Sequence, residues 1–150
     1  MRARIRVRAR IGDGLEKWKN HMMDMRLELV PLRTTDVDRS KAFYIDQVGF
    51  ILDHDAEPGN GVRVVQLTPP GSSCSVVFGV GISNPDDAPA HGLHLVVDDI
   101  AAVRHTLLAK GVEVSAIDEM GGGVSHSYFS DPDGNSWVLQ QLAGRGVRAR

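Results

Sequence analysis

Four polar side chains in the second half of the chain have the spacing of groups on one face of a β-sheet. His126 and Tyr128 lie two residues apart, and His94 and Gln140 hold matching places in two other segments. Alternate residues of a strand point to the same face, so these groups converge if the segments are neighbouring strands. Two imidazoles beside a phenol can act as acid and base near neutral pH. His94, His126 and Tyr128 are therefore candidate catalytic residues, with purely structural roles as the alternative.

The first half of the chain adds candidates for binding a ligand. Arg33 suits a carboxylate or phosphate, because its guanidinium donates two parallel hydrogen bonds, and a structural ion pair is its alternative role. Ser75 offers a hydroxyl group. On segment 62–68, either Arg63 or, after a shift of one residue, Gln66 points to the same face. The predicted ligand-binding residues are Arg33, Arg63, Ser75, His94, His126, Tyr128 and Gln140.

A pattern of elements that occurs twice, 62 or 63 residues apart, must position these side chains. Asp36 begins one predicted helix and Asp98 or Asp99 begins the other, because a carboxylate accepts hydrogen bonds from free backbone N–H groups. Gly49 and Gly111 end the two helices. The predicted helices are 36–48 and 98–110, and the predicted strands are 26–34, 50–54, 62–68, 74–80, 93–97, 112–117, 125–130 and 136–142.

This repeat predicts an α+β fold in which two βαβββ modules form a curved mixed sheet with a shared concave cup. Neither half buries a core well alone, and ligand pockets form in such concavities. The predicted parts of the chain are a basic, disordered N-terminal extension (1–24), a first module (25–82), a linker (83–90), a second module (91–142) and a basic tail (143–150).

Charge is divided unevenly along the chain. Residues 1–20 carry seven basic side chains, whereas residues 25–142 carry 7 basic and 16 acidic ones, a net charge of −9. Phosphate contacts require clustered Lys and Arg, so the acidic body argues against nucleic acid as a partner. No apolar run reaches the roughly 18 residues of a membrane span, and no secretory signal is visible. Cys74 is the single cysteine, which excludes an internal disulfide, and we expect a cytoplasmic location.

Three stretches of the sequence resemble the vicinal oxygen chelate superfamily, which includes glyoxalase I, extradiol dioxygenases, and the bleomycin and fosfomycin resistance proteins. The first is residues 35–44 followed by Val48-Gly49-Phe50, the second is residues 95–100, and the third is residues 129–135. The resemblance spans about 25–142. It implies the paired βαβββ modules and the cup of the glyoxalase/bleomycin resistance/dihydroxybiphenyl dioxygenase-like fold, but it is specific for no single activity.

The resemblance also implies where a metal would bind. In metal-dependent members, His, Gln or Glu ligands project from the first and fourth strands of each module. Here those positions hold Leu29, Ser75, Gly92 and Val138. Three of these side chains have no donor atom, and a lone serine hydroxyl is a weak ligand. We therefore expect no catalytic metal and no other cofactor, with a metal held by ligands shifted along these strands as the alternative.

The sequence thus predicts a protein of the glyoxalase and bleomycin-resistance group that binds a small organic molecule in its cup. Tyr128 has the position of a substrate-contacting tyrosine in fosfomycin resistance proteins, which this chain resembles. The competing hypothesis is a glyoxalase, lyase or dioxygenase type of enzyme that acts on a small oxygenated substrate, through a metal or through His94 and His126. We expect a homodimer, because each module leaves sheet edges uncovered and members of the superfamily commonly pair modules within or between chains.

Overall fold

The computed structural model describes residues 25–144, so the predicted N-terminal extension and residues 145–150 of the tail lie outside the described part. The predicted βαβββ pattern is present in both halves. The elements are β1 (Leu29–Pro31), α2 (Val37–Ala42), η1 (Phe43–Val48), β2 (Ile51–Gly59), β3 (Val62–Thr68), β4 (Ser75–Phe78), β5 (Leu93–Val96), α3 (Ile100–Ala109), β6 (Asp118–Glu119), β7 (Ser125–Ser130) and β8 (Ser136–Gln141).

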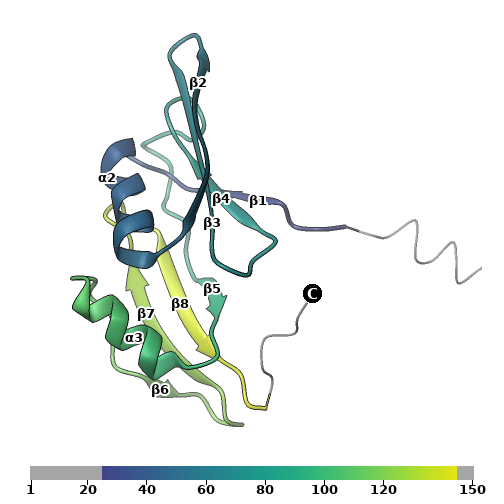
Figure 1. The fold of residues 1–150 in the computed structure, drawn as a ribbon, viewed down its shortest axis with the longest axis vertical. Helices are drawn as coiled ribbons and strands as arrows, with labels where there is room; N and C mark the ends of the chain where they lie inside the picture. Colours follow the sequence, from purple (N-terminus) through teal and green to yellow (C-terminus); the bar gives the residue numbers. More distant parts are fainter. Residues whose placement is uncertain (1–24, 145–150) are drawn as a thin grey trace, which may run out of the picture.

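The strands form two four-stranded sheets, one in each half of the chain, rather than one continuous sheet. Sheet 1 has the order β1-β4-β3-β2 and sheet 2 has the order β5-β8-β7-β6. The first strand of each module lies parallel to its last strand, β1 beside β4 and β5 beside β8. These matching orders confirm the α+β fold of two βαβββ modules. In Figure 1 the first module lies above the second, and α2 and α3 lie to the left of their sheets.

Both helices begin at the aspartates that the sequence indicated. The Asp36 carboxylate accepts a hydrogen bond from the backbone N–H of Arg39 at 3.1 Å, and the Asp99 carboxylate accepts one from Ala102 at 3.0 Å. Such caps satisfy N–H groups that have no partner within the helix. The first helix changes from α-helical to π-helical geometry at η1 and ends at Gly49, whose φ of 89° favours glycine.

The β2–β3 hairpin is longer than the sequence predicted. Pro58 indicated a turn at 57–61, but β2 continues through it to Gly59, because the outermost strand of a sheet tolerates a missing N–H donor. The turn is only Asn60 and Gly61, with φ angles of 55° and 74°. Two consecutive positive φ angles are typical of the type I′ turn that Asn-Gly favours. The hairpin therefore extends away from the rest of sheet 1 (Figure 1).

Segment 112–117 is not the strand that the sequence predicted. Its backbone still follows β7, since the Ser115 N–H donates to the Tyr128 carbonyl at 2.9 Å. However, the Tyr128 N–H donates to the Ser115 side-chain hydroxyl, at 2.9 Å, instead of to a backbone carbonyl. The serine side chain thus replaces one of the backbone hydrogen bonds that a regular pair of strands would form. On this side of β7, regular strand pairing begins only at β6.

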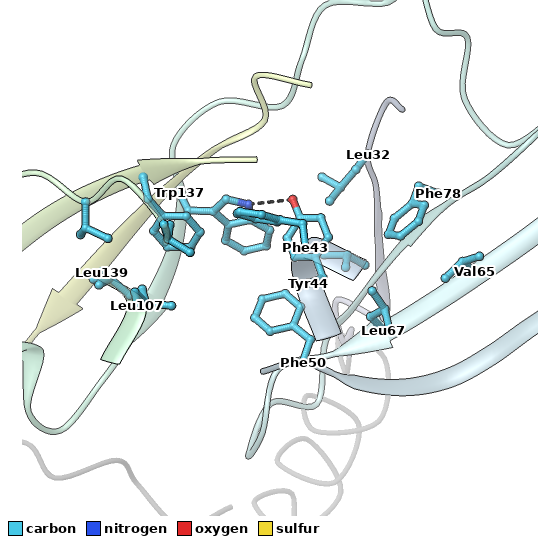
Figure 2. Packing of buried hydrophobic residues seen from close by; sticks show 14 of the residues in the cluster. Leu32, Phe43, Tyr44, Phe50, Val65, Leu67, Phe78, Leu107, Trp137 and Leu139 are labelled. Carbon is cyan, nitrogen blue, oxygen red and sulfur yellow. Dashed lines mark hydrogen bonds between the residues drawn. The ribbon is translucent and has the colours of Figure 1, made fainter. Parts of the chain in front are cut away.

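One hydrophobic core joins the two modules. Tyr44 is fully buried, stacks on Phe50 with ring centroids 5.3 Å apart, and meets Trp137 of the second module at 6.0 Å (Figure 2). The Trp137 indole donates to the Tyr44 hydroxyl at 3.0 Å, and that hydroxyl donates to the Asp131 carboxylate at 2.6 Å. Burial, followed by the charge of Asp131, raises the pKa of Tyr44 far above its ordinary value. Aromatic packing at the module junction is therefore accompanied by a hydrogen-bond network without unpaired polar groups.

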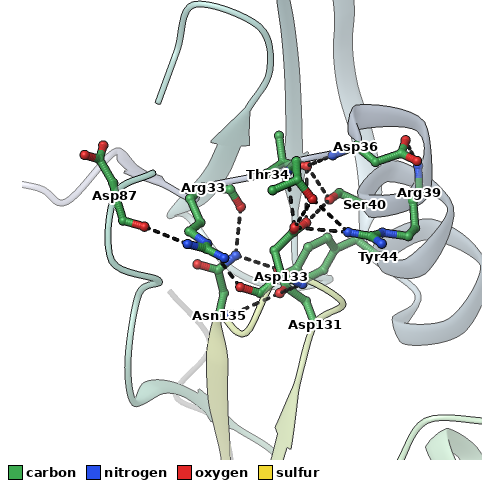
Figure 3. Close-up of polar contacts among 11 residues, drawn as sticks. Arg33, Thr34, Asp36, Arg39, Ser40, Tyr44, Asp87, Asp131, Asp133 and Asn135 are labelled. Atoms are coloured by element: carbon green, nitrogen blue, oxygen red, sulfur yellow. Dashed lines mark hydrogen bonds and ion pairs between the residues drawn. The ribbon is translucent and has the colours of Figure 1, made fainter. Parts of the chain in front are cut away.

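The turn between β7 and β8 also inserts Asp133 into the start of the first helix. Its carboxylate accepts hydrogen bonds from the Thr35 backbone and hydroxyl at 3.1 and 2.6 Å, from Ser40 at 3.2 Å and from Arg39 at 3.0 Å (Figure 3). Burial opposes ionisation, but the hydrogen bonds from Thr35 and Ser40 and the charge of Arg39 prevail and lower the pKa of the Asp133 carboxyl. Asp133 thus fixes the second module to the first.

Replacing Asp133 with Asn should lower the free energy of unfolding by about 2 kcal/mol at pH 7, because it removes a buried charge that accepts several hydrogen bonds. Folding lowers the pKa of this carboxyl, so its contribution is complete above the ordinary value of about 3.9. It is lost as the pH falls toward the lower folded value. The difference between the two proteins in urea denaturation should therefore shrink below about pH 4. Asp46→Asn, at an exposed helical position, is the control, and an equal effect of both changes would contradict the role of Asp133.

Candidate functional site

Each sheet has one face on the core and one face directed away from it, called here the outer face. In sheet 1, Val65 and Leu67 of β3 are buried in the core, and so are Val76 and Phe78 of β4. The alternate residues of the same strands therefore make the outer face. The outer face of sheet 1 includes Leu29, Pro31, Val64, Gln66, Thr68, Ser75 and Val77.

This alternation resolves the two alternatives for segment 62–68. Arg63 shares the core side with Val65, and Gln66 lies on the outer face. The Arg63 guanidinium donates two hydrogen bonds to the Asp55 carboxylate, at 3.0 and 2.9 Å, and one to Asp38 at 2.8 Å. Arg63 therefore connects the β2–β3 hairpin to α2. The placement of Arg63 with the other predicted ligand-binding residues was wrong. The number of residues between equivalent positions of the two modules changes by one at this strand, so the expected face is reversed.

Arg33 also lies apart from the outer faces. Its guanidinium donates to the backbone carbonyls of Asp133 at 3.2 Å and Asp87 at 2.9 Å (Figure 3). The Asn135 side chain completes the contact, since its amide donates to the Arg33 carbonyl at 3.0 Å. These bonds hold the linker and the β7–β8 turn to the end of β1. The structural alternative for Arg33 is therefore the one that its contacts support.

The outer face of sheet 2 brings together the candidates from the second half. The rings of His94 and His126 have centroids 5.6 Å apart, and those of His126 and Tyr128 are 6.1 Å apart. The Gln140 side-chain nitrogen lies 2.9 Å from His126 Nε2. Val138 lies beside His94 in the parallel pair of β5 and β8. Two imidazoles, a phenol and an amide thus form one continuous polar group, as strand alternation predicted.

Hydrogen-bond partners restrict which ring nitrogens can meet a ligand. His94 Nδ1 lies 2.7 Å from the Gly92 carbonyl, which can only accept, so this nitrogen carries the proton. In the neutral ring, His94 Nε2 is then a free acceptor. His126 Nε2 is occupied by the Gln140 amide, which leaves His126 Nδ1 as the donor of that ring. The group therefore presents an acceptor and a donor from neighbouring rings, with the Tyr128 hydroxyl beside them.

An open pocket of 540 Å³ adjoins this group. Tyr128 and Val138 of the outer face line it together with the core residues Phe129 and Trp137, whereas His94 and His126 are not among its lining residues. Tyr128 is 39% exposed although it is a large aromatic residue. Clefts of this size with aromatic walls and a few polar groups are typical sites for small molecules.

The positions that hold a metal in metal-dependent relatives have few donors here. Leu29 and Ser75 are direct neighbours in sheet 1, and Ser75 contributes only a hydroxyl, which is 2.6 Å from that of Thr68. Gly92 and Val138 contribute no side-chain donor. Within residues 25–144, no three His, Cys, Asp or Glu side chains converge in a group that could hold an ion. The residues present therefore do not fit a metal centre at these positions, and we derive no chemical step through one.

The sequence did not indicate a second polar group, on the outer face of sheet 1. The Thr68 hydroxyl donates to the Asp53 carboxylate and lies 2.6 Å from the Ser75 hydroxyl. Asp53 reaches this face by strand alternation, because it lies two residues after Ile51, which pairs with Thr68. The register shift between Leu52 and His54 changes the faces of the residues that follow Asp53.

The chain belongs to the Glyoxalase/Bleomycin resistance protein/Dioxygenase superfamily, whose family model matches residues 20–139. This confirms the family that the three sequence motifs indicated. No curated protein sequence matched the chain. None of the helices in residues 25–144 has the length and apolar character needed to cross a membrane.

Solved structures of the same superfamily are similar over most of the described chain. TnmS3, an antibiotic-binding protein from Streptomyces sp. CB03234, is 33% identical, with a TM-score of 0.69 over 82% of this chain and 100% of its own. A glyoxalase/bleomycin resistance protein from the same organism is also 33% identical, with a TM-score of 0.66 over 77% of this chain and 100% of its own. A superfamily member from Sphaerobacter thermophilus DSM 20745 is 26% identical, with a TM-score of 0.69 over 79% of this chain and 98% of its own.

The protonation of His94 is directly measurable. We expect long-range ¹H–¹⁵N NMR spectra above pH 8 to show neutral His94 with its proton on Nδ1, because the Gly92 carbonyl accepts from that nitrogen. The exposed His105, on α3, serves as the control for a ring without this bond. A neutral His94 that carries its proton on Nε2 would show that the bond to Gly92 is absent in solution.

Proposed function

We propose that this protein binds a small organic molecule on the outer face of sheet 2, and that it is a cytoplasmic homodimer that sequesters its ligand without a catalytic metal. The observation that carries the proposal is the convergence of His94, His126 and Tyr128 on one sheet face, where Tyr128 also lines an open pocket. The three rings offer flat apolar surfaces with polar atoms at their edges, which suits a ligand with aromatic rings. The similarity to TnmS3, an antibiotic-binding protein that is 33% identical to this chain, supports the same conclusion.

One observation favours an enzyme as the second candidate. The hydrogen bond from His94 Nδ1 to the Gly92 carbonyl fixes the orientation of the ring and leaves Nε2 able to accept a proton from a ligand. A fixed imidazole beside a phenol is an arrangement that can remove a proton from a bound substrate. Binding remains the first candidate because a backbone carbonyl, that of Gly92, orients His94, whereas a carboxylate does so in many catalytic groups of this kind. Turnover of the ligand would distinguish the two functions.

The exposed apolar side chains on both sheets support a dimer. Ile51 of sheet 1 is 56% exposed and Val96 of sheet 2 is 45% exposed, and all nine residues of β2 are exposed. Apolar groups gathered on a sheet face are stabilised when a partner removes them from water. Pairing the outer face of sheet 1 with sheet 2 of a second copy would cover both surfaces and enclose the pocket. The two modules supply complementary faces for a closed twofold assembly.

The hydroxyl of Tyr128 gives a direct test of ligand binding. We expect Tyr128→Phe to weaken binding by about 1 kcal/mol, through the loss of one hydrogen bond, and to leave the melting temperature unchanged. Calorimetric titration with metal-free bleomycin and a panel of aromatic antibiotics measures the affinity. Tyr44→Phe is the matched control, because its hydroxyl is bonded inside the core and should affect stability alone. Unchanged affinity in Tyr128→Phe, together with lost stability, would place the Tyr128 hydroxyl in a structural role.

The oligomeric state can be measured independently of ligand binding. We expect sedimentation equilibrium at micromolar concentration to give twice the chain mass of 16.3 kDa, because the outer faces pair. Ile51→Lys together with Val96→Lys should return the protein to a monomer, since each places a charge on an apolar face. A monomer in the unsubstituted protein at these concentrations would refute the pairing.

A further inference from the structure

Three side chains form a hydrogen-bonded chain across the outer face of sheet 1. None of the three takes part in the contacts between the two modules described above. Asp53, Thr68 and Ser75 come from three adjacent strands, β2, β3 and β4. The Thr68 hydroxyl donates to Asp53 and lies 2.6 Å from the Ser75 hydroxyl. The group is therefore ordered across the sheet, although Asp53 itself is exposed.

The number of protons fixes the direction of both hydrogen bonds. An ionised carboxylate only accepts, so the single hydroxyl proton of Thr68 points to Asp53. Thr68 then has only lone pairs for its neighbour, and Ser75 must donate to it. The only proton of Ser75 is used in this way. What the chain offers a ligand is consequently a set of acceptors, chiefly the exposed carboxylate oxygens of Asp53, because Ser75 itself is only 5% exposed.

Apolar side chains surround this hydrogen-bonded chain, and its own Asp53 carboxylate carries negative charge. Leu29 lies beside Ser75, and Ile51 lies opposite Thr68 in the strand register. Two basic side chains of this module, Lys41 and Arg63, form ion pairs with Asp55 on the core side of the sheet, away from this chain. A carboxylate on the open surface of an apolar face attracts a cation and repels an anion.

We propose that the Asp53–Thr68–Ser75 chain is a binding site for a primary ammonium group carried on an apolar body. The ammonium ion has three donors and no acceptor, which matches a site made only of acceptors. In the proposed dimer this site faces sheet 2 of the second copy, so the apolar body would lie between the two copies against Leu29 and Ile51. The site deepens the proposed function, on which it rests, by naming the chemistry of the ligand as an amphiphilic amine. An anionic ligand is unfavourable here because it would bring like charge to Asp53.

Three naphthalene compounds of matched shape test this site: 1-naphthylmethylamine, 1-naphthalenemethanol and 1-naphthoate. Each is titrated into the full-length ¹⁵N-labelled protein at pH 7, and binding is followed through backbone amide shifts. We expect the amine to bind about tenfold more tightly than the carboxylate, and to shift the amides of Asp53, Thr68 and Ser75. The alcohol should lie between them.

Two substitutions connect the preference to the named residues. Asp53→Asn should lower the affinity for the amine to that for the alcohol, while the alcohol is unaffected, because the amide still accepts from Thr68 but carries no charge. Asp46→Asn removes one negative charge at an exposed helical position and should change neither affinity. The amide spectrum of each variant shows directly whether it remains folded.

The outcomes separate this site from the proposed function. Equal binding of amine and carboxylate, or an amine affinity unchanged in Asp53→Asn, would overturn the site. Amine-induced shifts confined to His94, His126 and Tyr128 would also overturn it, and would leave the proposed function intact. Shifts at neither face up to millimolar concentration would contradict both.

Discussion

The structure depends on two buried carboxylates in one tight turn. Asp131 and Asp133 are two residues apart between β7 and β8, and both are directed into the first module. Asp133 accepts from the beginning of α2, and Asp131 accepts from the Tyr44 hydroxyl at its end. Buried carboxylates are stable only when hydrogen bonds satisfy them, so the helix and the turn must fold against each other. The aromatic cluster around Trp137 can close only when this junction is formed.

This junction determines where a ligand can bind. Because the core occupies the helix side of both sheets, their outer faces are the sheet surfaces that residues 25–144 leave uncovered. Sheet 2 places two imidazoles and a phenol on that face, and sheet 1 places a carboxylate and two hydroxyls there. The family thus gives the fold, and in the proposed function the outer-face residues carry ligand binding.

Local patterns in the sequence predicted most of the fold and half of the site. The repeat, the capping aspartates and Gly49 gave the modules and helices, and alternation placed His94 and His126 together. The remaining features depend on long-range contacts. The contact of Arg63 with Asp38 and the use of Arg33 at the junction follow from partners distant in sequence. Segment 112–117 was predicted as a strand because its pattern is apolar, but a side-chain hydroxyl replaces its ladder.

Native mass spectrometry tests the central claim, that the outer faces bind a small molecule without transforming it. The protein is purified without chelator and mixed with metal-free bleomycin and the panel of aromatic antibiotics. The account predicts a dimer that carries an intact ligand and no stoichiometric metal. A stoichiometric metal ion would contradict the metal-free site, and a ligand recovered with an altered mass would identify an enzyme. Failure of every compound to bind would contradict the binding function.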